Sequence, residues 1–62
     1  MHNKSDFRYA AKEIRETLRC AEEMMRRDDW VGAYTMWQEI AATATETEYA
    51  AEEMKRRKER GK

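Results

Sequence analysis

Charged side chains are the main chemical resource of this 62-residue chain, in which 42% of the residues are charged. Acid–base catalysis needs carboxylates with distinct roles in one site, but the neighbours Asp28 and Asp29 directly follow two arginines, a pattern that suits helix ends better. Most other carboxylates alternate with bases, as on solvated helix faces. The sequence has neither a glycine-rich phosphate loop nor a nucleophile with a histidine partner. We therefore expect no enzymatic activity.

The single histidine and the single cysteine do not indicate a metal site. His2 lies at the N-terminus, and no second histidine or cysteine pair stands at a metal-binding spacing. Cys20 lies beside the apolar residues of the first predicted helix, where we expect a reduced packing thiol. The sequence predicts no metal, no cofactor and no small-molecule substrate.

Charge is unevenly distributed although the net charge is zero. Residues 1–37 balance seven bases with seven acids, residues 38–54 contain five acids and no base, and residues 55–62 carry a net charge of +5. Such a basic end can bind a phosphate backbone without reading bases. A favourable helix dipole and solubility explain it equally well, so nucleic acid is not favoured. The candidate nucleic-acid contacts are Lys55, Arg56, Arg57, Lys58 and Arg60.

These side chains are positioned by two predicted helices, about residues 6–27 and 30–58, in one domain spanning residues 1–62. Apolar residues recur every three or four positions, as in a heptad pattern. In the first helix they are Phe7, Ala11, Ile14, Leu18, Ala21 and Met25, and in the second Trp30, Ala33, Trp37, Ile40, Ala44, Thr47, Ala51 and Met54. Ser5 or Asp6 is the expected cap of the first helix.

A turn at residues 27–29 joins the helices, because either Asp28 or Asp29 can cap a new helix. The three threonines of residues 43–47, with a capping-box spacing between Thr45 and Glu48, leave open a third helix after about Thr45. The heptad phase continues through this segment, which favours one long helix. The expected fold is an all-α antiparallel helical hairpin.

Two helices leave one side of each apolar pattern uncovered, so we expect a homodimer that forms a helical bundle. The predicted core or dimer seam consists of Phe7, Ile14, Leu18, Met25, Trp30, Ala33, Trp37, Ile40 and Met54. We expect both tryptophans to serve as core. No apolar run is long enough to span a membrane, and no signal-like segment follows the start, so the expected location is cytoplasmic.

Residues around the turn resemble a known family. The residues are Ala21, Glu23, Trp30, Ala33, Trp37 and Ala44, followed by Tyr49 and Ala50. They resemble the pattern of the AraC negative regulators, over residues 20–50. PerC-like regulators and tetratricopeptide helix pairs share part of this pattern. The resemblance implies a small, dimer-forming helical protein that binds AraC-type transcription activators and blocks them. Tyr49 stands where the family pattern has tryptophan, and Glu53 where it has arginine.

Three functions follow as alternatives. The first is a protein-binding inhibitor of a transcription activator, whose candidate partner-binding residues are Tyr34, Glu46, Glu48, Tyr49 and Glu52. In this reading the acidic section imitates phosphate and meets a basic surface of a DNA-binding partner. The second is a nucleic-acid accessory protein that uses the basic end. The third is a phage or mobile-element module with another host protein as its target.

Overall fold

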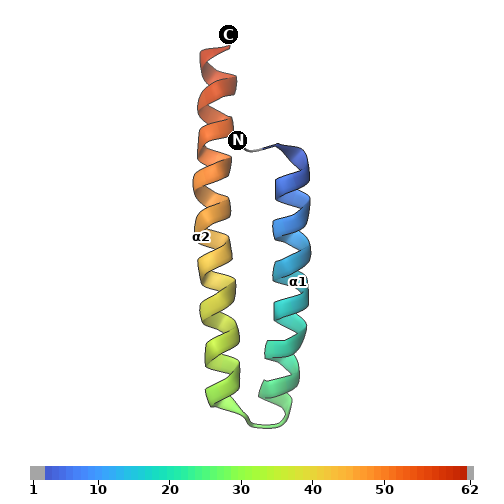
Figure 1. Ribbon diagram of the computed structural model, residues 1–62. Coiled ribbons are helices and arrows are strands. Elements are labelled where there is room, and N and C mark those ends of the chain that lie inside the picture. The colour runs from blue at the N-terminus through green and yellow to red at the C-terminus, as the bar shows by residue number, and fades with distance from the viewer. Residues whose placement is uncertain (1–2, 62) are drawn as a thin grey trace.

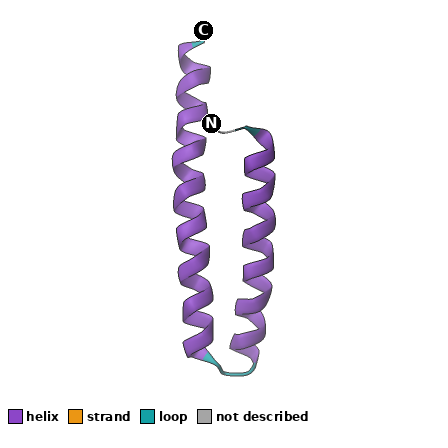
Figure 2. Ribbon diagram, in the orientation of Figure 1, coloured by secondary structure: helices purple, strands orange, loops and turns teal. Residues whose placement is uncertain are grey.

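Two antiparallel helices joined by a short turn make up the fold (Figure 1). The computed structural model describes residues 3–61; the predictions for Met1, His2 and Lys62 lie outside this range. Helix α1 spans Lys4–Arg26 and helix α2 spans Trp30–Arg60. Within the described residues the regular structure is entirely helical (Figure 2). The predicted all-α helical hairpin is therefore confirmed.

Asn3 caps the start of α1, two residues earlier than the nearer of the two predicted caps. Its side chain accepts a hydrogen bond from the amide of Asp6 at 3.1 Å, and the Asp6 carboxylate accepts one from the amide of Asn3, also at 3.1 Å. This reciprocal pair satisfies two amides that a helix start leaves free. The prediction that Ser5 or Asp6 is the cap was wrong, because Asp6 serves as the third residue of Asn3's capping box.

The turn at residues 27–29 closes α1 and opens α2. Asp28 has a left-handed backbone, with φ at 62°. This lets the amides of Asp28 and Asp29 donate to the carbonyls of Met25 and Met24, at 3.0 and 2.8 Å, as in a Schellman motif. Asp29 then caps α2 by accepting from the amide of Gly32 at 3.0 Å. Of the two candidate caps for the second helix, Asp29 is the one that acts.

Helix α2 runs without a break through residues 43–47. The hydroxyls of Thr45 and Thr47 donate to the carbonyls of Ala41 and Thr43, at 2.9 and 2.7 Å. Such bonds to the carbonyl four residues earlier are compatible with a continuing helix. The prediction of one long helix is confirmed, and the alternative of a third helix after about Thr45 is excluded.

The helices pack along inward positions that recur every three or four residues. Ala21 of α1 and Ala33 of α2 are inaccessible to solvent, and both lie in the half of the hairpin near the turn. The half-buried members are Phe7, Ala10, Ile14, Thr17 and Met24 in α1 and Met36, Ile40, Thr43, Thr47 and Met54 in α2, with Ala50 buried. No large side chain among the described residues is fully buried.

The predicted apolar pattern of α2 therefore mixes two sides of the helix. Its members that face α1 are Ala33, Ile40, Thr47 and Met54, and its exposed members are Trp30, Trp37, Ala44 and Ala51. Thr43 and Ala50, which the prediction left out, also face α1. In α1, likewise, Ala10 is half-buried and Ala11 is exposed. Two apolar stripes lie side by side on each helix, and only one of them can face the neighbouring helix. The second stripe stays on the surface of the hairpin.

Candidate protein-binding faces

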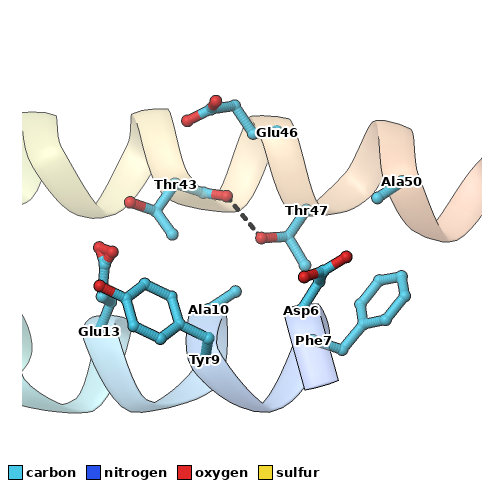
Figure 3. A pocket seen from close by; sticks show the side chains of 9 residues that line it. All are labelled: Asp6, Phe7, Tyr9, Ala10, Glu13, Thr43, Glu46, Thr47 and Ala50. Atoms are coloured by element: carbon cyan, nitrogen blue, oxygen red, sulfur yellow. Dashed lines mark hydrogen bonds between the residues drawn. The ribbon is translucent and has the colours of Figure 1, made fainter. Parts of the chain in front are cut away.

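Each face of the hairpin is formed by one side of α1 and one side of α2. Glu13 of α1 and Glu46 of α2 line the same groove (Figure 3). Each directly precedes an inward residue, Ile14 or Thr47. In an antiparallel helix pair, the positions four after Ile14 and four after Thr47, and those seven residues away from them along each helix, then share the opposite face. The hairpin thus has two faces of different chemistry.

The first face carries an acidic groove of about 210 Å³ near the open end of the hairpin. We use this name for the groove lined by Asp6, Phe7, Tyr9, Ala10, Glu13, Thr43, Glu46, Thr47 and Ala50. In Figure 3, Phe7 and Ala50 mark one end of the groove and Glu13 and Thr43 the other. The groove combines carboxylates with an apolar floor, a composition that suits a protein side chain bearing a cation.

The carboxylates of Glu13 and Glu46 have no ion-pair partner among residues 3–61. Ion pairs lie elsewhere: Glu23 contacts Arg26 at 3.3 Å and Arg27 at 3.2 Å. These pairs are exposed and close in sequence, so each contributes little to stability. The groove therefore presents uncompensated negative charge from both helices, with Glu13 half-buried.

The predicted partner-binding residues do not form a single cluster. Glu46 lies in the acidic groove, and Tyr49 is 69% exposed close by on α2. Tyr34 is exposed but lies nearer the opposite face, four positions after Trp30. Glu48 and Glu52 are exposed, and Glu52 pairs with Arg56 at 3.3 Å. The structure brings Glu46 together with polar side chains of α1 that were not among the predicted partner-binding residues.

These polar side chains of α1 are Asp6, Tyr9 and Glu13. The sequence held a signal for two of them, because Asp6 and Glu13 are seven residues apart and so lie on one side of a helix. Their meeting with Glu46 depends on the register between the helices, which spacing within one helix does not determine.

The second face is apolar. We call it the apolar face and define it by Ala11, Leu18 and Met25 of α1 with Trp30, Trp37, Ala44 and Ala51 of α2. Leu18 and Met25 are half-buried, and Trp30 and Trp37 are 58% and 42% exposed. The indole of Trp30 donates to the carboxylate of Asp28 at 2.6 Å. The expectation that both tryptophans serve as core was wrong for the single chain, because their side chains lie on the surface of the helix pair. Their place in a dimer seam stays a prediction.

The basic end forms a helical extension. Helix α2 continues beyond the start of α1, so its last turns have no neighbouring helix (Figure 1). Arg57 pairs with Glu53 at 2.7 Å and Arg56 with Glu52, whereas Lys55, Lys58 and Arg60 have no ion pair within the described range. Intrahelical pairing thus reduces the cationic character of this end.

Cys20 is exposed. The expectation of a packing thiol was wrong, because Cys20 precedes the inward residue Ala21 and so lies on the side of the helix pair that carries the acidic groove. No three metal-ligand side chains gather in the part of the chain that the structure describes. Neither described helix has an apolar stretch of the length that crosses a membrane.

The comparisons with known proteins give no relative to set beside this geometry. No family model matches the chain, and no curated protein or solved structure matches it significantly.

Proposed function

We propose that this chain is a small, non-enzymatic cytoplasmic regulator that binds a basic surface of a protein partner through the acidic groove. The observation that carries the proposal is the meeting of Glu13 and Glu46, from different helices, beside Tyr9. Unpaired carboxylates attract cationic side chains and orient the encounter. Tyrosine supplies rigid contact area with a polar tip, which protein interfaces favour.

The partner class we propose is a transcription activator of the AraC type. The resemblance of residues 20–50 to the AraC negative regulators motivates this choice, and the groove adds a physical reason. A DNA-binding protein has a basic surface that meets phosphate, and carboxylates spaced along a helix pair can occupy the same surface. In this mechanism the chain inhibits the activator by competing with its DNA.

Titration of the purified DNA-binding domain of an AraC-type activator from the same genome tests the proposal. We expect binding that duplex operator DNA displaces and that weakens as salt is raised, because screening shortens the reach of exposed charges. The double variant Glu13→Gln and Glu46→Gln should lose on the order of tenfold or more in affinity, the effect of removing interfacial charge.

The matched control is the double variant Glu16→Gln and Glu59→Gln, which removes the same charge outside the acidic groove. It should bind nearly as well as the parent chain. Equal losses of affinity in both variants would mean that net charge, and not the position of the carboxylates in the acidic groove, drives binding. Binding that ignores operator DNA would contradict inhibition by competition.

A second candidate function is nucleic-acid binding by the basic end, which the free helical extension favours. Lys55, Lys58 and Arg60 are the cations there without an ion pair among the described residues. Fluorescence anisotropy with labelled duplex DNA would reveal affinity that falls steeply with salt. Changing these three residues to glutamine should abolish that binding, and unchanged affinity would eliminate this function.

A further inference from the structure

The apolar face supports an inference that goes beyond the proposed function. We propose that a second copy of this chain covers the apolar face, with its turn at the opposite end, so that α2 packs antiparallel on α2 and α1 on α1. The acidic groove stays outside in this arrangement and remains available to a partner.

The single hairpin has too small a core to be complete. The fully buried side chains are alanines, and no large side chain among the described residues is fully buried. A chain of this size gains little stability from its own core, and association is one of the common ways in which small chains are stabilised further. Covering Leu18, Met25, Trp30 and Trp37 with apolar surface would supply the missing burial.

The sizes of the side chains on the apolar face favour a second copy as its occupant and indicate how that copy is oriented. Met24 lies against Gly32 near the turn, and Ala10 and Thr47 share the groove near the open end. The register between these points places the large members of the apolar face, Leu18, Met25, Trp30 and Trp37, in the half near the turn. The small members Ala11, Ala44 and Ala51 occupy the half near the open end.

An antiparallel copy matches large residues with small ones. In α2, residues 30 and 51 and residues 37 and 44 are symmetric about the point between residues 40 and 41. A twofold axis at this point sets Trp37 against Ala44 of the second copy and Trp30 against Ala51 of the second copy. A parallel copy would instead set tryptophan against Leu18 and Met25 and leave alanines facing alanines, which packs poorly.

Charges at the edge of the apolar face agree with this direction. Arg8, Arg15 and Glu22 recur every seven residues along the outer side of α1, with the arginines toward the open end. Reversal of the second copy brings both arginines toward its Glu22. Opposite charges at such flanking positions determine orientation in helical bundles.

The available area also fits. The hairpin measures 51 × 16 × 15 Å. The 51 Å length includes the end of α2 that extends beyond α1 (Figure 1). Over the roughly 35 Å that the 23 residues of α1 span, one face is roughly 550 Å². Two copies would therefore bury roughly 1,100 Å² in total, about the least that a specific interface needs.

Light scattering on the full chain should give twice the 7.5 kDa chain mass at low micromolar concentration. Ala44→Trp alone should weaken the dimer on the order of 100-fold, because two tryptophans would meet. Trp37→Ala alone should weaken it by removing the central anchor. The double variant Trp37→Ala and Ala44→Trp should restore dimerisation, because it rebuilds the same large-to-small pair in reverse.

The matched control is Trp37→Ala with Ala51→Trp, which adds the same bulk in the wrong register and should not restore the dimer. Circular dichroism will show whether each variant remains helical. A parent chain that is monomeric at low micromolar concentration, or an Ala44→Trp variant that dimerises unchanged, would overturn the proposal.

Spin-label distances test the direction independently of side-chain size. Single cysteines at Val31 and Gln38, in a Cys20→Ser background, lie seven residues apart on the outside of α2. In the antiparallel dimer the axial separation between copies is roughly 29 Å at Val31 and roughly 8 Å at Gln38, at ~1.5 Å per residue. Equal distances at the two positions would mean a parallel dimer and would refute the proposed register.

Discussion

At the residue scale, Asp28 and Asp29 have different tasks although they are neighbours of one type. Asp28 adopts the left-handed conformation that ends α1, and Asp29 caps α2. Aspartate tolerates the left-handed region better than most residues other than glycine and asparagine. The sequence predicts a turn here, but the division of labour depends on backbone angles that two equivalent side chains do not specify.

Replacing Asp28 by glycine should leave the chain about 1 kcal/mol more stable than replacing it by alanine. Glycine adopts φ near 62° without a steric penalty, whereas alanine does not. Urea unfolding of both variants at one protein concentration will measure the difference. Equal stabilities would mean that the left-handed turn is not present in solution.

Asp29→Ala should lower the free energy of unfolding by about 1 kcal/mol, because the amide of Gly32 loses the acceptor at 3.0 Å. Asp29→Asn should preserve most of the stability, since an amide oxygen also caps. Thermal unfolding followed by circular dichroism will rank the variants. A drop as large for asparagine as for alanine would make charge, rather than capping, the cause.

At the element scale, the helices and the turn were predictable and the packing surface was not. Propensity, capping residues and apolar spacing indicate two helices and their approximate ends. They do not reveal which of two apolar stripes faces the other helix, because Thr43 with Ala50 and Ala44 with Ala51 are equally plausible from spacing. The acidic groove was missed for the same reason, since Glu13 meets Glu46 only in one register.

Continuity of α2 can be tested with proline at position 46. In a continuous helix, Glu46→Pro removes an amide donor and clashes with the preceding turn, at a cost of about 3 kcal/mol or more. If a new helix began after Thr45, position 46 would be its first residue and proline would be tolerated. We expect a large loss of helicity by circular dichroism, whereas Glu46→Ala, which removes only the side chain, should stay folded.

The fully buried alanines Ala21 and Ala33 leave no room for a larger side chain between the helices. Ala33→Leu adds volume where solvent exposure is zero, so it should destabilise the hairpin by about 1 to 3 kcal/mol. Ala42→Leu places the same side chain at an exposed position of α2 and should be nearly neutral. Chemical denaturation of the pair measures the contrast, and similar values would argue against the observed register.

At the scale of the whole molecule, stability should depend on concentration. If association covers the apolar face, the melting temperature must rise with protein concentration, because binding stabilises the folded form by mass action. Calorimetry over a hundredfold dilution series checks this. Sodium chloride should have a small effect on the same melting curves, since the ion pairs are exposed and local; a strong effect would assign stability to charges rather than to apolar contact.

The positions of the tryptophans make the fluorescence of this protein report on one of its two faces and not on the other. Both tryptophans of the chain belong to the apolar face, and the acidic groove contains none. Indole emission shifts to shorter wavelength when water leaves the ring. Tyr9, beside the acidic groove, does not contribute to this signal when tryptophan alone is excited. Emission of the unmodified chain, excited selectively at tryptophan, should therefore follow self-association and stay silent when a tryptophan-free partner binds the groove.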